Sequence, residues 1–291
     1  MRQPPPDPSP AGHAYVDGVF VPAREARVSA FDRGFLMADG VYEVAAVLDG
    51  RLVDNDAHLD RLDRSLAALD LPSPVSRAAL IAIEHELVAR DGVREGLIYM
   101  QVTRGPAERE FAFPDTPRPT LVAFGQKKAI LDSPAARAGI RAIAAPDIRW
   151  GRRDIKSIAL LAQAMARQDA RRAGADEAFL VEDGAITEGA ASTVFAVTPA
   201  GELVTRPLSR AVLAGCTRAR VLEGARAVGL PVSERALTVA DVLAASECFI
   251  ASATAFVTPV VALDGRPIGA GRPGPLAQRL RALYIEKVRA A

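Results

Sequence analysis

The chain has 291 residues, of which 49% are hydrophobic, so it is long enough for about two domains with substantial cores. Its 36 Lys and Arg residues nearly balance 35 Asp and Glu residues, and a net charge of +1 spread along the chain argues against nucleic-acid binding. The longest apolar region, residues 248–263, is too short and too interrupted to span a membrane. Cys216 and Cys248 have no CxxC spacing, so we expect reduced core residues in a cytoplasmic protein.

The N-terminal stretch, residues 1–12, is rich in proline and predicts a disordered tail. After it, short apolar runs are joined in pairs by Asp-Gly, the dipeptide that favours a type I′ turn. We therefore predict antiparallel hairpins in both halves of the chain. Their turns are Asp17-Gly18, Asp49-Gly50, Asp183-Gly184 and Asp264-Gly265.

Two amphipathic helices and two strands follow the first hairpins. They are expected at residues 55–70, 74–90, 97–103 and 120–124. Ser73 is expected to cap the second helix and Gly92 to end it. The strands are joined by the long loop 104–119, which contains four prolines and the apolar residues Phe111 and Phe113. A loop of that length in a compact domain is usually functional or mobile.

The polar segment 125–138 predicts a linker between a small N-terminal domain, residues 13–124, and a larger C-terminal domain, residues 139–291. The second domain is expected to contain strands at 140–145, 193–198, 202–205, 248–251 and 257–263, and helices after residue 156, at 218–228 and at 275–289. Helices scattered among hairpins indicate an α+β fold with antiparallel or mixed sheets and flanking helices.

Lys156 is the most informative single residue. Only four of the 36 cationic side chains are lysine, and Lys156 alone lies among apolar residues. A lysine, unlike an arginine, can lose its proton and attack a carbonyl group. We expect Ser157 to cap a helix of about four turns, and we expect the start of that helix, with Arg152 and Arg153, to lower the pKa of the Lys156 amine. A solvated loop lysine is the alternative from position alone.

Other features of the chain carry less weight. The sequence Gly269-Ala270-Gly271-Arg272-Pro273-Gly274 spells GxGxxG, but no strand or acidic ribose partner follows it, so we predict a loop before a helix. The three histidines, His13, His58 and His85, are far apart in sequence. We therefore expect neither a metal site nor a Ser-His-Asp triad.

Three other positions have the residue types that pyridoxal phosphate needs beside a lysine. Glu188 ends a short strand at a Gly turn and is a candidate partner for the pyridine nitrogen. Gly215-Cys216-Thr217 leads into a helix N-terminus, where free N–H groups favour a phosphate. Arg61 is a candidate phosphate partner. Read alone, these residues also fit an ordinary turn acid, helix N-cap and exposed arginine.

The chain resembles the fold-type IV pyridoxal-phosphate enzymes, and within them the D-amino acid aminotransferases, from about Ala14 to Tyr284. The matching segments are Asp32-Arg33-Gly34-Phe35, Asp39-Gly40-Val41-Tyr42-Glu43-Val44, His58-Leu59-Asp60-Arg61-Leu62, Tyr99-Met100-Gln101-Val102-Thr103-Arg104-Gly105, Asp147-Ile148-Arg149-Trp150, Asp154-Ile155-Lys156-Ser157, Thr187-Glu188-Gly189, Gly215-Cys216-Thr217-Arg218 and Thr258-Pro259-Val260. The resemblance implies a two-domain fold whose C-terminal domain binds the cofactor.

The resemblance also implies the cofactor-binding residues. Lys156 would form the Schiff base with pyridoxal 5'-phosphate and shuttle the proton, and Glu188 would pair with the pyridinium nitrogen. Arg61 and Thr217 would hold the phosphate. The other implied cofactor contacts are Cys216, Ser252 and Ala253.

For the substrate, the resemblance implies that Tyr42 and Arg109 hold the α-carboxylate, with Phe111 beside them. In this family the Arg109 loop contributes to the neighbouring subunit's site, so the resemblance implies a homodimer. Two residues depart from the family pattern. Phe111 stands where D-amino acid aminotransferases often have His, and Ala253 stands where the family usually has Thr.

The function implied is exchange of the amino group of a D-amino acid with a 2-oxo acid such as 2-oxoglutarate or pyruvate. An (R)-selective amine transaminase remains an alternative, because loss of the His opens the pocket to substrates without a carboxylate. A branched-chain aminotransferase and a 4-amino-4-deoxychorismate lyase are further alternatives of the same fold. A cofactor-binding or partner-binding protein without catalysis is the non-enzymatic alternative.

Overall fold

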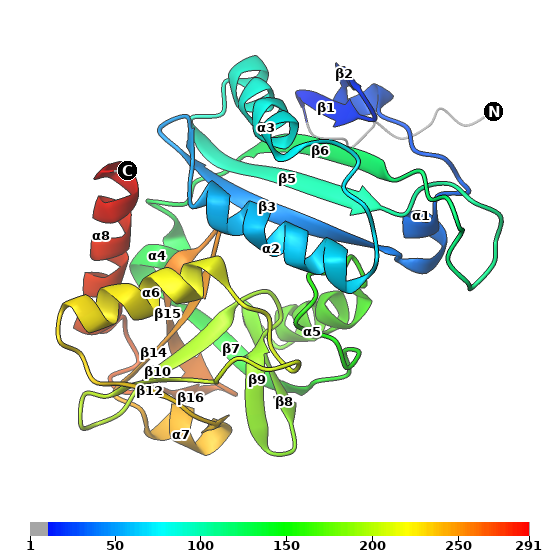
Figure 1. Cartoon of the computed structure of the whole chain (residues 1–291). Coiled ribbons are helices and arrows are strands. Elements are labelled where there is room, and N and C mark those ends of the chain that lie inside the picture. The colour runs from blue at the N-terminus through cyan, green and yellow to red at the C-terminus, as the bar shows by residue number, and fades with distance from the viewer. Residues whose placement is uncertain (1–10, 291) are drawn as a thin grey trace, which may run out of the picture. The chain divides into compact units, whose positions relative to one another are not determined.

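The computed structural model describes residues 11–290 of the chain, which divides into two compact units (Figure 1). The first unit contains Met1–Lys128 and Ile155–Ala159, and the second contains Ala129–Asp154 and Leu160–Ala291. Residues 155–159 therefore belong to the first unit, although the sequence placed them in the second domain. Of the predicted tail, residues 1–12, positions 1–10 lie outside the described residues.

The first unit is built on a six-stranded antiparallel sheet with the order β2-β1-β6-β5-β3-β4. Its strands are β1 (His13–Val16), β2 (Val19–Pro22), β3 (Gly40–Leu48), β4 (Arg51–Leu52), β5 (Glu95–Thr103) and β6 (Thr120–Lys127). Successive side chains of a strand point to opposite faces. In β3, Val41 and Val47 therefore face the core, and Tyr42 faces the other way.

The helices α2 (Asn55–Ala68) and α3 (Arg77–Asp91) cover the core face of this sheet (Figure 1). Leu59, Leu62 and Leu66 recur at helical spacing in α2 and are at most 3% exposed. Burial of each such leucine stabilises the unit by roughly 2 kcal/mol. Two shorter elements, η1 (Ala23–Glu25) and α1 (Arg33–Met37), precede β3.

The N-terminal end of α3 differs from the prediction. Its N-cap is Ser76, whose hydroxyl accepts a hydrogen bond from the Ala79 N–H, so the expected cap at Ser73 is wrong. Ser73 instead donates to the Val75 carbonyl oxygen and belongs to the preceding turn. The predicted stop is confirmed, because Gly92 is the C-cap and has a φ of 56°.

The four predicted Asp-Gly hairpins are confirmed. Each joins two antiparallel strands through a two-residue loop, and both loop residues have positive φ, as in Asp264 (50°) and Gly265 (73°). Type I′ turns require positive φ at both positions, which Asp and Gly tolerate.

The second unit contains a ten-stranded mixed sheet with the order β12-β11-β10-β14-β15-β7-β8-β9-β13, and β16 also pairs with β15. The strands are β7 (Ile140–Pro146), β8 (Glu177–Glu182), β9 (Ala185–Gly189), β10 (Thr193–Val197), β11 (Leu203–Thr205), β12 (Val232–Glu234), β13 (Leu237–Thr238), β14 (Glu247–Ser252), β15 (Phe256–Leu263) and β16 (Arg266–Pro267). Three pairings are parallel, β11 with β12, β15 with β7 and β7 with β8. The expected α+β fold with antiparallel and mixed sheets is confirmed.

The helices of the second unit are α4 (Pro134–Ala138), α5 (Leu161–Arg172), α6 (Cys216–Ala227), α7 (Val239–Ala244) and α8 (Pro275–Ala290). Helix α4 and the last residues of β6 lie within the expected linker, residues 125–138. Two predicted helix starts are wrong. Helix α5 begins at Leu161 without a side-chain cap, because Ser157 is paired with β3 instead. Helix α6 has Gly215 as its N-cap, so Thr217 lies inside the helix.

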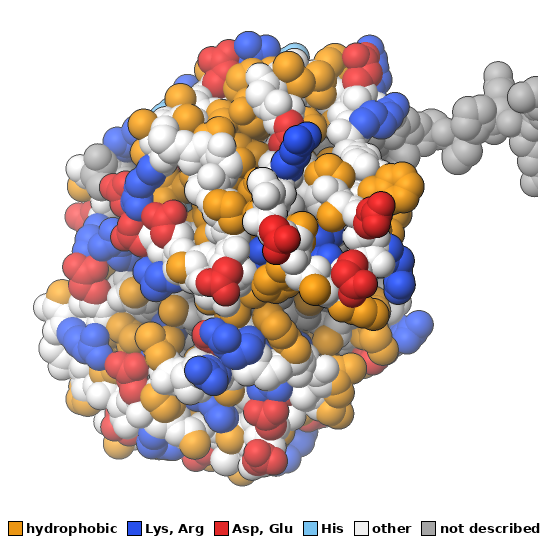
Figure 2. All heavy atoms as spheres, turned by 45° about the vertical axis from the view of Figure 1, so that its right-hand side comes forward, with side chains coloured by type: hydrophobic (Ala, Val, Ile, Leu, Met, Phe, Trp, Pro, Cys, Tyr) orange, Lys and Arg blue, Asp and Glu red, His pale blue; other side chains and the backbone are white. Residues whose placement is uncertain are grey.

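The surface carries no large area of one charge on the face drawn in Figure 2, where acidic, basic and hydrophobic side chains are intermixed. This agrees with the near balance of charges in the sequence. Among residues 11–290, no helix combines the length and the hydropathy needed to cross a bilayer.

Candidate active site

The Lys156 segment is joined to the edge of β3 by backbone hydrogen bonds within the first unit. Tyr42 N donates to the Lys156 carbonyl oxygen at 3.0 Å, and Ile158 N donates to the Gly40 carbonyl oxygen at 3.1 Å. Lys156 N also donates to Ser65 Oγ of α2 at 3.3 Å. These contacts fix the backbone of Lys156 as firmly as that of a strand residue, which a catalytic amine requires.

The amine of Lys156 lies over the ring of Tyr42, with Nζ 4.1 Å from the ring centre. No carboxylate forms an ion pair with it in the part of the chain that the structure describes. Of the neighbouring arginines, Arg152 pairs with Asp154 and Arg153 pairs with Glu182. The expected position at a helix start is wrong, since α5 begins only at Leu161.

Tyr42 continues into an aromatic row on the same face of the sheet. Its ring stacks on Tyr99 of β5 at 5.6 Å, and Tyr99 stacks on Phe124 of β6 at 5.0 Å. The Tyr99 hydroxyl donates to Gln101 Oε1 at 2.7 Å. Burial, with a smaller effect of Tyr42, raises the pKa of Tyr99, so its hydroxyl stays protonated. The aromatic ring next to the Lys156 amine therefore belongs to a row of three stacked side chains.

Arg61 lies on the opposite, helix-covered face of this sheet. Its Nε and Nη2 donate to the two carboxylate oxygens of Glu43 at 2.7 and 2.8 Å, and His58 Nδ1 lies 2.8 Å from Glu43 Oε2. Burial alone would raise the pKa of Glu43, but Arg61 and His58 outweigh it and lower that pKa to about 2. Arg61 is 5% exposed and is rigidly held by this pair.

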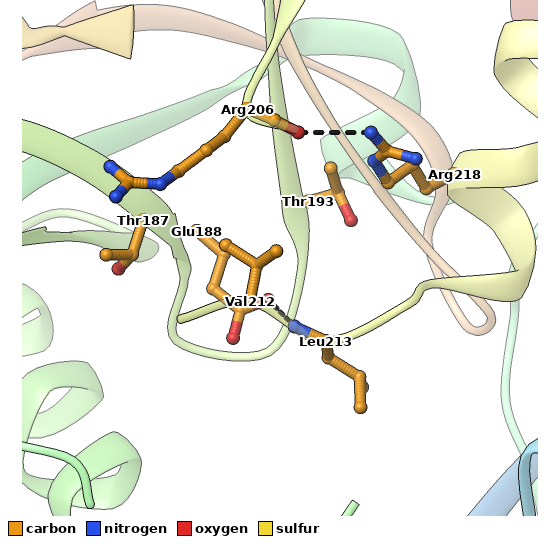
Figure 3. Close-up of a pocket in the computed structure, with 7 residues that line it drawn as sticks. All are labelled: Thr187, Glu188, Thr193, Arg206, Val212, Leu213 and Arg218. Atoms are coloured by element: carbon orange, nitrogen blue, oxygen red, sulfur yellow. Dashed lines mark hydrogen bonds between the residues drawn. The ribbon is translucent and has the colours of Figure 1, made fainter. Parts of the chain in front are cut away.

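Glu188 lies at the end of β9 in the second unit, where the carboxylate is held from two sides. Arg149 Nη1 donates to Glu188 Oε1 in a short contact. Leu213 N donates to Glu188 Oε2 at 3.1 Å (Figure 3). Glu188 is 7% exposed. A buried carboxylate with a cation on one oxygen and an amide on the other keeps a fixed orientation.

Arg149 is itself oriented by Asp147. Its Nε and Nη2 donate to the two carboxylate oxygens of Asp147 at 2.9 and 2.7 Å, and Thr187 Oγ1 donates to Asp147 Oδ2 at 2.6 Å. Burial would raise the pKa of Asp147, but these hydrogen bonds and the charge of Arg149 lower it. The planar guanidinium thus spans two carboxylates, a geometry that a lysine cannot reproduce.

A small pocket opens beside Glu188 within the second unit (Figure 3). It is lined by Thr187, Glu188, Thr193, Arg206, Val212, Leu213 and Arg218. Arg218 donates to the Arg206 carbonyl oxygen at 3.0 Å and pairs with Glu234 at 2.6 Å. The pocket joins β9, β10 and the start of α6, so Glu188 lies next to the helix that carries Thr217.

Helix α6 meets the requirements of an anion site at its N-terminus. Its N-cap Gly215 supplies no side-chain acceptor to the first-turn N–H groups, which begin at Cys216 and Thr217. Ser252 and Ala253 lie where β14 ends, in the turn that leads to β15. Uncapped N–H groups and the helix dipole favour a phosphate. In the second unit, the N–H donors of α6 therefore fit the phosphate of the expected cofactor, and the Glu188 carboxylate fits its pyridinium nitrogen as an acceptor.

The long loop of the first unit carries Arg109 and Phe111 on its surface. Phe111 is 77% exposed, and the Arg109 guanidinium lies 5.7 Å from its ring centre. Neither residue contacts Lys156 or Tyr42 in the described chain. The structure thus groups Lys156 with Tyr42 in the first unit, and Glu188 with the start of α6 in the second.

Residues that support the candidate side chains were missed by residue-level reasoning. Arg149, Glu43 and Tyr99 each contact one of them, and all three lie in segments that carried the resemblance. Their partners are distant in sequence, so no local pattern pointed to them. The spacing of Asp147 and Arg149, which places both on one side of an extended segment, was the one available signal.

Comparison with known proteins identifies the family. The chain matches the family described as amino-transferase class IV over residues 40–263. It is 39% identical over 267 residues to a D-alanine aminotransferase of Bacillus licheniformis, with 91% of this chain and 93% of that protein covered. It is 34% identical over 275 residues to a D-alanine aminotransferase of Listeria innocua, covering 94% of this chain and 95% of that one.

Solved structures agree on the fold. A branched-chain amino acid aminotransferase of Escherichia coli superimposes with a TM-score of 0.88 at 23% identity, covering 96% of this chain and 95% of that one. A hypothetical aminotransferase from Mycobacterium tuberculosis, in a PLP-bound form, gives a TM-score of 0.82 at 25% identity, covering 96% of this chain and 99% of that one. The fold-type IV architecture expected from the sequence is confirmed.

Proposed function

Because the chain belongs to the amino-transferase class IV family, whose members are pyridoxal-phosphate-dependent aminotransferases, we propose that it exchanges the amino group of a D-amino acid with a 2-oxo acid. The observation that carries the proposal is the Lys156 amine. It is fixed to β3 through its backbone, faces an aromatic ring, and has no acidic partner in the described residues. Similarity to D-alanine aminotransferases over more than nine-tenths of the chain supports the D-amino acid as substrate.

Pyridoxal 5'-phosphate supplies the electron sink that makes the substrate Cα–H bond acidic. We propose that Lys156 would hold the cofactor through Nζ and that its free amine would accept the Cα proton. Glu188 would accept a hydrogen bond from the protonated pyridine nitrogen, and Arg149 stabilises the negative charge of Glu188. Thr217, the α6 N–H groups and Arg61 would hold the phosphate, with Cys216, Ser252 and Ala253 beside it.

We propose that Arg109 and Tyr42 bind the α-carboxylate of the substrate. A guanidinium gives paired charge-assisted hydrogen bonds to a carboxylate and so fixes its orientation. Phe111 adds an apolar surface next to Arg109.

An (R)-selective amine transaminase is the second candidate, and a specific observation favours it. Phe111, at the position where related enzymes often have His, is an exposed apolar ring on the Arg109 loop. An apolar group at this point donates no hydrogen bond to a carboxylate and tolerates an uncharged substituent. The branched-chain aminotransferase of Escherichia coli shares the fold but is less similar in sequence than the D-alanine aminotransferases.

A half-reaction screen tests the proposed function. The purified holoenzyme is mixed with single D-amino acids, L-amino acids or (R)-amines, and the absorbance of the bound cofactor is followed. Bleaching with D-alanine and not with L-alanine is expected. Bleaching with L-branched-chain amino acids alone, or pyruvate release from 4-amino-4-deoxychorismate without any amino acceptor, would reject the proposal. Borohydride reduction and peptide mapping should place the cofactor on Lys156.

We also propose that the enzyme is a homodimer in which the Arg109 loop serves the partner's site. Several large apolar side chains just before α1, in α1 and in this loop are exposed, and exposed apolar surface is typical of an interface. They are Phe31, Phe35, Leu36, Phe111 and Phe113. Light scattering should give twice the 30.7 kDa chain mass.

Mixed dimers test the shared site directly. A Lys156→Ala homodimer and an Arg109→Ala homodimer are dissociated, mixed and reassociated. If Arg109 acts across the interface, each mixed dimer regains one intact site, and activity rises above that of either parent. No recovery in mixed dimers would show that Arg109 acts within its own subunit.

A cytoplasmic location is proposed from cysteine chemistry. Cys216 and Cys248 are both buried and free. Reduced thiols are usual in a cytoplasmic protein. Cell fractionation followed by immunodetection would check the location.

A further inference from the structure

One buried guanidinium holds the tip of the 104–119 loop. Arg33, the first residue of α1, is 2% exposed. Its Nη1 donates to the carbonyl oxygens of Glu110, in a short contact, and Ala112, at 3.3 Å, and its Nη2 donates to that of Phe111 at 3.2 Å. Three consecutive carbonyl groups thus converge on a single side chain.

Asp39 fixes the orientation of this guanidinium. Arg33 Nε donates to Asp39 Oδ2 at 2.7 Å, and Arg104 Nε donates to the same oxygen at 2.8 Å. Arg104 also donates to two carbonyl oxygens after α2, and its guanidinium lies 3.6 Å from the Phe113 ring centre. Because one carboxylate serves two buried cations, each guanidinium depends on backbone carbonyl oxygens for its remaining partners.

The base and the tip of the loop are attached in different ways. At the base, backbone bonds join Arg33 N to the Gly105 oxygen at 3.0 Å and Ala107 N to the Phe31 oxygen at 3.2 Å. At the tip, the hydrogen bonds that reach the rest of the described unit come from the Arg33 side chain. The carbonyl groups of residues 110–112 are therefore held by the Arg33 side chain, the Phe113 ring also contacts Arg104, and the base is held by backbone bonds.

The segment held by Arg33 contains the residues proposed to meet the substrate. Arg109 precedes the first of the three carbonyl groups, and Phe111 carries the second. Both side chains are exposed, so they do not fix the backbone themselves. A displacement of about 1 Å in a group that orients substrate is enough to cost about 10²-fold in rate.

We propose that Arg33 is a positioning residue for the substrate carboxylate: it fixes the backbone of residues 110–112 and so sets the place of Arg109. The inference rests on the proposed function of Arg109 as the carboxylate anchor. Arg33 itself, 2% exposed beneath the loop, touches no substrate. Its effect is confined to substrates that carry a carboxylate.

Arg33→Lys tests the proposal with the least disturbance of the fold. Lysine retains the charge next to Asp39 but lacks the planar set of donors that reaches three carbonyl groups. Val88→Ala is the matched control, since it removes buried methyl groups from α3 in the same unit without touching the loop. Both variants and the wild type are measured as holoenzyme and as apoprotein.

Two readouts separate positioning from a general loss of stability. Cleavage by trypsin after Arg109, an exposed residue of the loop, should accelerate by about tenfold or more in Arg33→Lys, because the carbonyl groups of residues 110–112 lose their hydrogen bonds to a charged group, and should be unchanged in Val88→Ala. The KM for D-alanine should rise by about tenfold to a hundredfold in Arg33→Lys with a smaller change in kcat. The KM for an uncharged (R)-amine should not change.

Unchanged cleavage after Arg109 would overturn the proposal, and so would faster cleavage with an unchanged KM for D-alanine. An equal rise of KM for the amine would assign Arg33 a structural role only. If the wild-type enzyme takes no D-amino acid, the proposed function fails instead, and the rate of cleavage after Arg109 in the apoprotein still decides whether Arg33 holds the tip.

Discussion

Glu84 provides a quantitative test of the buried charges in the first unit. It lies on α3, is 3% exposed, and accepts a hydrogen bond from Asn55 Nδ2 at 2.6 Å. Burial is the main cause that raises its pKa from 4.5 to about 7, and the negative charge of Glu43 adds to the effect. The amide oxygen of the same asparagine, Asn55 Oδ1, is buried without a hydrogen-bond partner. A protonated Glu84 carboxyl group supplies an O–H donor near this amide.

The sign of the pH dependence follows from the direction of this shift. Between pH 4.5 and about 7 the folded chain binds the Glu84 proton and the unfolded chain does not, so stability falls as the pH rises through this range. The stabilisation is fully present below pH 4.5 and is lost above the folded-state pKa. A shift from 4.5 to about 7 corresponds to roughly 3 kcal/mol.

Glu84→Gln removes the titration and keeps the shape of the side chain. We expect the free energy of unfolding of the wild type, minus that of Glu84→Gln, to fall by about 3 kcal/mol between pH 4.5 and pH 8. Urea unfolding followed by far-UV circular dichroism at several pH values measures this difference, in which the other titrating groups cancel. Infrared spectroscopy should detect a protonated carboxyl group at pH 6 that the variant lacks. A difference that is independent of pH would refute the reasoning.

Three further predictions concern the active site. Glu188→Gln should lower kcat by roughly tenfold to a hundredfold while the cofactor remains bound, because it removes the negative charge that faces the ring nitrogen and leaves the phosphate site unchanged. Unchanged turnover would reject the pairing of Glu188 with the ring nitrogen. Arg149→Met should lower both kcat and the unfolding midpoint, since the Asp147 and Glu188 carboxylates lose the cation that they share. A change in kcat alone, or in the unfolding midpoint alone, would contradict this shared role of Arg149. Arg109→Ala should raise the KM for D-alanine by roughly tenfold or more and leave that for an (R)-amine unchanged, as checked by steady-state kinetics.

The features that the sequence predicted well are local. Each Asp-Gly turn depends on two adjacent residues that tolerate positive φ, so the four hairpins could be placed from sequence. The leucine spacing of α2 is equally local. The end of α3 at Gly92 follows from the ease with which glycine adopts a left-handed conformation.

The features that were missed depend on distant partners. Ser157 has the residue type of an N-cap, but its segment pairs with β3 across more than a hundred residues, and α5 starts later. Arg33 and Asp39 lie in a segment that carried the resemblance, and only the tertiary structure shows that Arg33 reaches the loop tip and that Asp39 orients its guanidinium. Sequence periodicity gives no information on which buried arginine meets which carbonyl group.

The contrast between arginine and lysine explains why one lysine could be singled out. Buried arginines of this chain each bridge two or more acceptors, which needs a planar group with several donors. They include Arg33, Arg61, Arg104, Arg153, Arg218 and Arg281. Lys287 forms an ordinary surface pair with Glu223. Lys156 does not bridge acceptors in this way, since its amine lies over the Tyr42 ring and has no ion-pair partner among residues 11–290. A position that needs neither a bridge nor a surface charge retains lysine for the one property that arginine lacks, a nitrogen that can become a neutral nucleophile.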